Sequence, residues 1–313
     1  MYDIIKKLSE IPQRRNEMQP IIPAFSPVNI CFAANGGYAP YLAVSMYSLL
    51  CNADKSRLYD IIVLCNNVPE ESLERLGKIA AMFDCCSLRF VDMSDFHMSV
   101  KDRHSSYITA ETNYRLAILG ELFGNYDRVL YLDCDTIILG DVSELFDTDL
   151  CGKAVGGAEA VDIRIFMYTK KSFFIGDYPY NFGGYAEKFM GIHYLERYFN
   201  AGVTLFDLKK CREITSADAA VELLNRRKWI FNDQDVLNML FNESVCMLDI
   251  KWNYTTNIEQ AYSDIAMRGI VSDCRRTEYG IIHYTSIRKP WNSRTPLDGY
   301  YHKYEKELQE DGI

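Results

Sequence analysis

The chain has 313 residues, a length that suits one large α/β domain or two small ones. Hydrophobic residues make up 48% of it, enough for a sizeable core, and the formal net charge is −9 with a pI near 5.2. This charge balance argues against nucleic acid or an anionic membrane surface as the main partner, and no apolar run approaches the roughly 18–20 residues that span a bilayer.

The first hundred residues alternate between predicted strands and predicted helices. Residues 1–28 form an extension, in which residues 2–8 are predicted to be a short helix followed by a proline-containing linker. A strand–helix–strand–helix–strand order then predicts a parallel α/β sheet with right-handed connections. The predicted strands cover residues 28–34, 59–64 and 88–91, and the helices between them cover residues 40–50 and 69–83.

The stretch from Arg128 to Leu145 is the most informative part of the chain. A predicted helix over residues 111–123 leads into it, and the apolar run RVLYL then stops at Asp133-Cys134-Asp135. Such a run is typical of a strand buried on both faces in a mostly parallel sheet, where ligands bind beyond the carboxyl ends of the strands. Two carboxylates at that place could bind a hard divalent cation such as Mg²⁺ or Mn²⁺.

Two other interpretations of this motif have to be weighed. An Asp pair after a strand is often only a turn with a helix cap. The run Asp133-Cys134-Asp135-Thr136 also matches the Asp-x-Asp-x-Thr pattern of haloacid-dehalogenase-type phosphatases, in which the first Asp is a nucleophile. That family carries its motif near the amino terminus and a later acidic pair, whereas here the motif lies in mid-chain and Gln234 separates Asp233 from Asp235.

The second half of the chain mixes strands, helices and a long aromatic segment. Residues 163–197 are rich in aromatic residues and glycine, and their rings could either pack a surface loop or stack on sugar rings. Strands are predicted over residues 153–160, 201–206, 245–248 and 281–284, and helices over residues 218–227, 233–241 and from residue 297 onward.

Polar residues follow apolar segments at three further points. Asn200 could satisfy its own turn or donate to a substrate hydroxyl or diphosphate, with Gly202 allowing close approach. In the run Asn232-Asp233-Gln234-Asp235, one residue could cap the following helix, but capping does not explain four polar residues in a row. His283 could complete a metal site begun by two Asp residues, and Lys289 could bind a phosphate as a point charge.

The ten cysteines show no C-x-x-C spacing. Cys31, Cys65, Cys134 and Cys246 lie in apolar, strand-like runs, so we interpret the cysteines as reduced core residues rather than as disulfides or zinc ligands. The amino terminus also lacks the apolar core of a signal peptide. These features predict a cytoplasmic protein.

Six segments taken together resemble glycosyltransferase family 8, the group of glycogenin and the bacterial lipopolysaccharide α-galactosyl- and glucosyltransferases. The resemblance covers residues 29–291 and leaves residues 1–28 as an extension and residues 292–313 as a helical tail. It implies an α/β fold of the GT-A type, with a mostly parallel, Rossmann-like sheet flanked by helices in a single domain. The segments are FAANGGYAPYLAVSMYSLL at 32–50, HSSYITAETNYRLAILGELF at 104–123, YDRVLYLDCDTIILGDVSELFDTDL at 126–150, YFNAGVTLFDLKK at 198–210, NDQDVLNMLF at 232–241 and HYTSIRKPW at 283–291.

The resemblance also implies an activity, namely retaining transfer of a hexose, glucose or galactose, from a UDP-sugar to a glycan, lipid-linked or protein acceptor. It implies that Asp133, Asp135 and His283 bind Mn²⁺, or Mg²⁺ in its place, and that the ion stabilises the departing UDP. By similarity, the residues that bind UDP are Ala33, Asn35, His104 and Lys289, and those that bind the donor sugar are Arg115, Asn200, Asp233 and Gln234.

By the same similarity, the catalytic candidates are Gln234, which faces the anomeric carbon, and the carboxylates Asp233 and Asp235 beside it. Retention could proceed through attack by Asp235 and a covalent intermediate, although Gln234 is nearer and is a poor nucleophile. Alternatively, the acceptor could enter on the face that UDP leaves, with the leaving phosphate taking the acceptor proton. We favour this second route, in which the protein contributes positioning and charge stabilisation.

Two positions depart from the family pattern. The turn Asn35-Gly36-Gly37 lacks the acidic residue that relatives usually carry before the Tyr, which leaves base selectivity open. Ser286 replaces a glycine whose backbone could approach the diphosphate, so this serine needs a compatible φ. The alternative hypothesis is therefore a non-catalytic protein that binds a nucleotide sugar in a decayed site.

Overall fold

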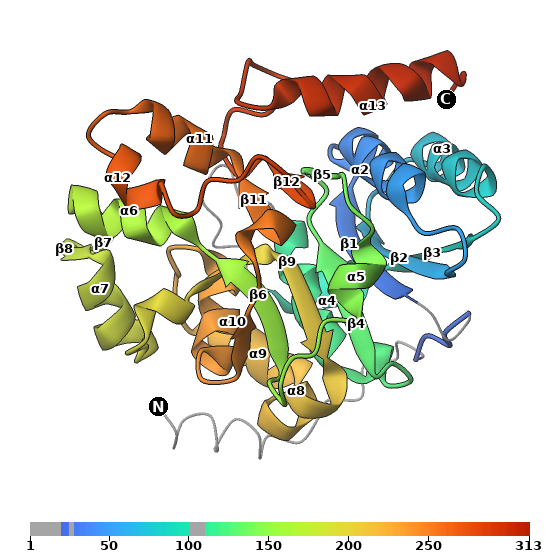
Figure 1. The fold of residues 1–313 in the computed structure, drawn as a ribbon. Coiled ribbons are helices and arrows are strands. Elements are labelled where there is room, and N and C mark those ends of the chain that lie inside the picture. The colour runs from blue at the N-terminus through green and yellow to red at the C-terminus, as the bar shows by residue number, and fades with distance from the viewer. Residues whose placement is uncertain (1–19, 25–27, 101–109) are drawn as a thin grey trace.

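A seven-stranded sheet forms the centre of a computed structural model, which describes residues 20–24, 28–100 and 110–313 (Figure 1). The predicted helix over residues 2–8 and the candidate residue His104 lie outside the described residues. The strands, in spatial order, are β10 (Val245–Met247), β6 (Val155–Glu159), β9 (Phe199–Asp207), β4 (Arg128–Leu132), β1 (Val28–Asn35), β2 (Tyr59–Asn66) and β3 (Cys86–Asp92).

The prediction of a mostly parallel sheet is confirmed, with one strand reversed. β9 is antiparallel to both of its neighbours, β4 and β6, whereas the β1–β2, β1–β4, β2–β3 and β10–β6 pairs are parallel. β9 is buried nearly throughout, so its apolar pattern does not reveal its direction. Because β9 is reversed, its first residues rather than its last ones lie at the carboxyl edge of the neighbouring strands.

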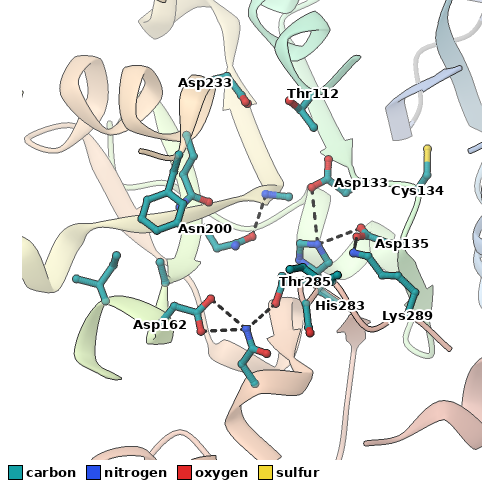
Figure 2. A pocket seen from close by; sticks show the side chains of 18 of the residues that line it. Thr112, Asp133, Cys134, Asp135, Asp162, Asn200, Asp233, His283, Thr285 and Lys289 are labelled. Carbon is teal, nitrogen blue, oxygen red and sulfur yellow. Dashed lines mark hydrogen bonds and ion pairs between the residues drawn. The ribbon is translucent and has the colours of Figure 1, made fainter. Parts of the chain in front are cut away.

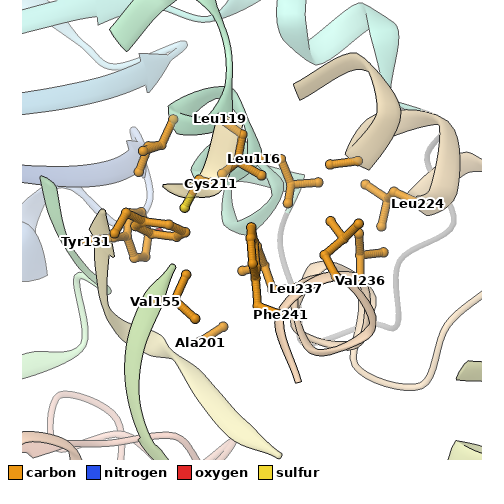
Figure 3. Close-up of a cluster of buried hydrophobic side chains, with 14 of the residues drawn as sticks. Leu116, Leu119, Tyr131, Val155, Ala201, Cys211, Leu224, Val236, Leu237 and Phe241 are labelled. Carbon is orange, nitrogen blue, oxygen red and sulfur yellow. The ribbon is translucent and has the colours of Figure 1, made fainter. Parts of the chain in front are cut away.

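Helices cover both faces of the sheet and enclose two apolar clusters. Neighbouring residues of β1 point to opposite faces, with Ile30 and Phe32 in one cluster and Cys31 and Ala33 in the other. On the first face pack α2 (Ala39–Asn52), α3 (Glu70–Ala81) and α13 (Asp298–Glu310). On the second face, shown in Figure 3, pack α8 (Leu208–Ile214), α9 (Ala217–Arg226) and α10 (Asn232–Phe241).

The predicted helix over residues 111–123 is present, but it is a 3₁₀ helix rather than an α-helix and is interrupted once. The segment forms two 3₁₀ helices, η1 (Ala110–Leu119) and η2 (Glu121–Phe123), which are separated by Gly120 in an extended conformation. A 3₁₀ helix of this length is uncommon. Tyr114, Leu116 and Ile118 are fully buried in η1, so packing against the sheet holds the segment in place, not intrinsic helix propensity.

A small sheet and a hairpin complete the fold. In the small sheet, β12 (Ile281–His283) pairs in parallel with β11 (Tyr254–Thr255) and antiparallel with β5 (Thr136–Ile138). The hairpin of β7 (Ser172–Ile175) and β8 (Tyr178–Asn181) lies within the aromatic segment. The remaining elements are α4 (Ser94–Ser99), α5 (Val142–Phe146), α6 (Val161–Thr169), α7 (Phe182–Tyr185), the π-helix η3 (Ala186–Met190), η4 (Leu195–Arg197), η5 (Ile250–Asn253), α11 (Thr256–Ser263) and α12 (Arg268–Val271).

The cysteines mostly behave as core residues. All ten are free, and Cys31, Cys65 and Cys134 are buried as predicted, whereas Cys246 is half-buried and Cys151 is exposed. Among the described residues, no helix has both the length and the apolar character needed to cross a membrane.

Gly157 in β6 is expected to be essential for close packing within the sheet. A Cβ atom at this position would lie 2.7 Å from Cδ2 and 2.8 Å from Cγ of Phe199, which is fully buried and has little room to move. Gly157→Ala should therefore lower the free energy of unfolding by about 1–3 kcal/mol, measured by urea denaturation. The matched control is Gly269→Ala in α12, where nothing lies within 4 Å of the added Cβ. Equal unfolding midpoints for the two variants would contradict the argument.

Candidate functional site

The carboxyl edge of the main sheet borders a cavity of about 570 Å³. β1 and β4 end there and β9 begins there, so Asn35, Asp133 and Asn200 line the same cavity although they are far apart in the chain. Figure 2 shows Asp133 and Asn200 in it. A cavity of this volume can hold a small-molecule ligand. Every candidate site residue within the described chain lines it, with the exception of Asp235.

Asp133, Asp135 and His283 lie close enough to share one metal ion. One potential ligand atom from each lies within 4.8 Å of the others, and His283 Nε2 is 3.1 Å from Asp135 Oδ1 and 3.7 Å from Asp133 Oδ2 (Figure 2). The pairing of β12 with β5 brings them together, because His283 stands opposite Thr136 and the Tyr284 N–H donates to the Asp135 carbonyl.

A chain of hydrogen bonds determines which nitrogen of His283 carries a proton. Asn200 Oδ1 accepts from Asn253 Nδ2 at 2.9 Å and from the Gly202 N–H at 3.0 Å. Asn253 therefore directs its Oδ1 at His283 Nδ1, 2.8 Å away, and this nitrogen must donate. The lone pair of Nε2 then faces Asp135 Oδ1, a buried oxygen without a hydrogen-bond donor. Carboxylate oxygens and an imidazole lone pair that meet without a donor fit a divalent cation.

Lys289 controls the charge of Asp135. Its Nζ pairs with Asp135 Oδ2 and donates to the Tyr284 carbonyl. Burial alone would raise the pKa of Asp135, but the positive charge of Lys289 opposes burial and holds this pKa well below its ordinary value. Asp135 is therefore ionised at neutral pH, as a metal ligand must be.

Gly202 provides the space for this cluster. A Cβ atom at Gly202 would collide with His283 Cε1 and lie 2.6 Å from Asp133 Oδ2, and the Gly202 carbonyl accepts the Asp133 N–H at 2.8 Å. The sequence predicted a close approach at this glycine. In the structure, the groups that approach it are two side chains of the site.

Arg115 connects carboxylates from two distant segments. Its Nη2 is 2.9 Å from Asp133 Oδ1 and its Nε is 2.8 Å from Asp233 Oδ2. The guanidinium is 4% exposed and lies 4.5 Å above the ring of Tyr131, whose hydroxyl donates to Asp133. Burial raises the pKa of Asp233 to about 6, because Arg115 offsets burial only in part and Asp133 adds to it. Arg115 is thus a fixed cation between the Asp133 cluster and the start of α10.

Asp235 is a buried hydrogen-bond acceptor rather than a residue of the cavity. Tyr198 donates to its Oδ1 and Tyr185 to its Oδ2, each at 2.6 Å, and the Phe231 N–H also donates to Oδ2 at 2.9 Å. The side chain is fully buried, which raises its pKa although these three donors lower it. The structure therefore does not place Asp235 beside a reacting centre. The prediction that one of these polar residues caps the helix is also not met, because α10 begins at Asn232 and Phe231 occupies the N-cap position.

Hydrogen bonds at both ends orient the Gln234 amide. Its Oε1 accepts the Ala201 N–H at 3.1 Å and its Nε2 donates to the Tyr198 hydroxyl at 3.3 Å. Because the Tyr198 hydroxyl donates its hydrogen bond to Asp235, its oxygen can still accept a hydrogen bond from Nε2. Asp235 therefore acts on Gln234 through Tyr198.

The end of β1 meets an acidic residue that sequence analysis missed. Asn35 Oδ1 accepts the Tyr38 N–H, and its Nδ2 donates to Glu111 Oε2 at 2.9 Å. Glu111 belongs to η1, is nearly buried and lines the cavity. No local pattern signals this contact, because 76 residues separate the two positions. Ser286 also lines the cavity, and its φ is not positive, so serine is accommodated there without backbone strain.

The cavity extends beyond the predicted residues toward α6 and α11. There Asp162 accepts two contacts from Asn257 Nδ2, at 3.0 and 3.1 Å, and Asn257 also contacts Thr285 (Figure 2). The walls around this group are largely apolar and include Ile163, Phe166, Phe231 and Met267. This part therefore combines apolar surfaces with a few fixed polar groups, as ligand-binding cavities commonly do.

The comparisons with known proteins agree with this geometry. The model of glycosyl transferase family 8 matches residues 29–295. General stress protein A of Bacillus subtilis is 25% identical over 288 residues, which cover 88% of this chain and 92% of that protein. A lipopolysaccharide 1,2-glucosyltransferase of Escherichia coli is 25% identical over 272 residues, covering 84% of this chain and 73% of the relative.

Solved structures show the same fold. The apo structure of the bifunctional glycosyltransferase WbbM matches with a TM-score of 0.81 and 26% identity, over 93% of this chain and 53% of that chain, so this chain spans about half of it. The galactosyltransferase LgtC, in complex with donor and acceptor sugar analogs, matches with a TM-score of 0.70 and 26% identity, over 90% of this chain and 96% of that one. These matches group the chain with glycosyltransferases rather than with haloacid-dehalogenase-type phosphatases.

Gly202→Ala tests whether the cluster of Asp133, Asp135 and His283 requires a residue without a side chain at position 202. We expect the added methyl group to displace the His283 ring and to lower the free energy of unfolding by about 1–3 kcal/mol, measured by urea denaturation. In a His283→Ala background the penalty should shrink, because the ring with which the methyl group collides is gone. Gly299→Ala is the matched control, since nothing lies within 4 Å of its added Cβ. An unchanged ring position and unfolding midpoint in Gly202→Ala would refute the argument.

Proposed function

Because the chain belongs to glycosyltransferase family 8, we infer that it transfers a hexose from a UDP-sugar to a glycan, lipid-linked or protein acceptor, with retention at the anomeric carbon. The observation that carries this proposal is the meeting of Asp133, Asp135 and His283 beside Lys289 in one cavity. Glucose or galactose as the hexose is supported by the names of two relatives, a lipopolysaccharide 1,2-glucosyltransferase and the galactosyltransferase LgtC.

The residues present fit a divalent metal, which we propose to be Mn²⁺, with Mg²⁺ as the alternative. Asp133, Asp135 and the Nε2 lone pair of His283 would hold it, and Asp135 Oδ1, which lacks a donor, would gain a partner. When bound, such an ion acts as a Lewis acid toward the diphosphate. Its charge would also compensate the two carboxylates that Arg115 and Lys289 neutralise only in part.

The remaining candidate residues would bind the two ends of the donor. Lys289 would exchange its contact with Asp135 for a phosphate oxygen, which suits a mobile point charge on a flexible stem. Arg115, Asn200, Asp233 and Gln234 would surround the hexose. The residues proposed for the uridine are Ala33, Asn35 and His104, and we add Glu111, whose carboxylate next to Asn35 supplies the acidic group that the turn lacks.

For the chemical step we propose front-face substitution. The bond between the anomeric carbon and the UDP oxygen breaks, the acceptor hydroxyl forms its bond on the same face, and the leaving phosphate oxygen takes the hydroxyl proton. A covalent route would need Asp235 as nucleophile, but both of its oxygens accept hydrogen bonds and its side chain does not line the cavity. Gln234, oriented by Tyr198 and Ala201, would provide a fixed dipole next to the anomeric carbon.

Binding of metal and UDP should raise the melting temperature together. At saturating UDP and Mn²⁺ we expect a rise of about 5 °C, which EDTA removes. Asp135→Asn should abolish the rise and the Mn²⁺-dependent hydrolysis of UDP-glucose or UDP-galactose. Asp127→Asn is the control, because this exposed residue lies at the opposite end of β4 and forms an ion pair with Lys209. Equal shifts with and without Mn²⁺ would overturn the metal assignment, and binding without any turnover would support the non-catalytic alternative.

Variants of Tyr198 and Asp235 separate a positioning role from a nucleophilic one. If Asp235 orients Gln234 through Tyr198, then Tyr198→Phe and Asp235→Asn should lower kcat for donor hydrolysis by similar factors, on the order of 10–100, with UDP affinity unchanged. Tyr194→Phe, an exposed tyrosine, serves as the control. A nucleophilic Asp235 would instead make Asp235→Asn far more damaging than Tyr198→Phe.

A further inference from the structure

Asn253 is a buried residue, 1% exposed, that lies beside the candidate metal ligands without lining the cavity. Its Oδ1 is 2.8 Å from His283 Nδ1, and its Nδ2 donates to Asn200 Oδ1 at 2.9 Å. The two partners belong to different parts of the proposed site, since His283 is a candidate metal ligand and Asn200 is a candidate residue for the donor sugar. Asn253 is therefore a direct link between these two parts.

The backbone around Asn253 is held from two sides. Asn253 is the last residue of η5 and directly precedes β11, which pairs with β12, the strand that carries His283. Trp252 packs closely on Gly280, where a Cβ atom would lie 2.5 Å from Cε3 of the indole, and the Gly280 N–H donates to the Lys251 carbonyl at 2.9 Å. Because this backbone is fixed, the main freedom left to Asn253 is which end of its amide faces His283.

Asn200 removes this freedom. Its Oδ1 accepts the Gly202 N–H at 3.0 Å, so the oxygen of the Asn200 amide faces Asn253. A reversed Asn253 amide would place two oxygens against each other and would lose a hydrogen bond between buried groups, which is unfavourable. Asn200 also lines the cavity, and because both of these contacts use its oxygen, its amide nitrogen remains for a ligand there.

We propose that Asn253 is a positioning residue that couples the donor-sugar side of the cavity to the metal side. With the Asn253 oxygen held toward it, His283 keeps its proton on Nδ1 and presents Nε2 to Asp133 and Asp135. Removal of the Asn200 side chain would release the Asn253 amide and so weaken the metal site, although Asn200 is not a candidate ligand of the ion. The proposal rests on the proposed function, since it takes the cluster to bind a divalent cation.

The first experiment measures the Mn²⁺ affinity of the protein by calorimetry, with no donor or acceptor present. Asn253→Leu should bind Mn²⁺ about 10–100-fold more weakly, because His283 loses the partner that orients it. Asn200→Ala should cause a smaller loss, about fivefold, because the Asn200 carbonyl remains as a weaker partner of Asn253 Nδ2 at 3.4 Å. Asn253→Asp keeps an acceptor for His283 and should bind Mn²⁺ at least as tightly as the wild type.

Asn29→Leu is the matched control for the loss of a buried amide. Asn29 is 9% exposed, and its Nδ2 donates to the Arg128 carbonyl at 2.9 Å, at the end of β1 away from the cavity. This variant should keep the wild-type affinity for Mn²⁺. Urea denaturation checks that every variant is folded, and if Asn253→Leu does not fold, Asn200→Ala decides the affinity test.

The second experiment determines directly where the proton of His283 lies. Nitrogen NMR of the isotope-labelled, metal-free protein at mildly alkaline pH distinguishes the two ring nitrogens, and His283→Ala identifies the signals. The wild type and Asn253→Asp should carry the proton on Nδ1, whereas Asn253→Leu and Asn200→Ala should show a mixture of both tautomers. A merely structural role of Asn253 would lower stability without changing these signals.

The outcomes separate this proposal from the proposed function. If the wild type binds no Mn²⁺, the metal assignment of the proposed function fails, and the NMR signals alone decide whether Asn200 and Asn253 orient the ring. A proton on Nε2 of His283 in the wild type would overturn the positioning role. Wild-type affinity for Mn²⁺ in Asn253→Leu would overturn it as well, and wild-type affinity in Asn200→Ala would overturn the coupling.

Discussion

Negative charge concentrated at one edge of the sheet is the constraint on which the site depends. Asp133, Asp135 and Asp233 share one cavity, and their mutual repulsion would be unfavourable if no cation compensated it. Arg115 is held between two of them and Lys289 pairs with the third. The two cations differ in their surroundings, since Arg115 is buried over Tyr131 whereas the Lys289 side chain is slightly more exposed.

Because of this difference, the two cations are suited to different roles. Arg115 is always charged and has its donors in a rigid plane, so it keeps the carboxylates of β4 and α10 at a constant separation. Lys289 is a point charge on a flexible stem and, in the proposed function, would leave Asp135 to bind a phosphate. His283 lies at the same place, and its ring is oriented by the contact of Nδ1 with Asn253. The site is therefore arranged before any ligand binds, which lowers the cost of binding it.

An aromatic layer connects this chemistry to the surface. Tyr198 and Tyr185 hold Asp235, Phe182 packs on both tyrosines, and Phe173 continues the contacts into the hairpin. The orientation of Gln234 and the position of the hairpin thus rest on the same group of rings. This layer gives the aromatic segment a structural role, which agrees with the first of the two interpretations drawn from the sequence, namely that its rings pack a surface loop.

The sequence by itself determined the buried strands and most of the helices, because apolar runs and the polar residues that end them are local patterns. All but one of the candidate site residues within the described chain also line the cavity. Only the tertiary structure decided that β9 runs in reverse, that residues 110–123 form 3₁₀ helices, and that β12 pairs with β5 to bring His283 to Asp135. It also decided that Glu111 faces Asn35 and that Asp235 is engaged by two tyrosines. These features arise from contacts between segments dozens of residues apart. The energy of such contacts depends on how the segments pack and how deeply they are buried, which cannot be read from the sequence of one segment alone.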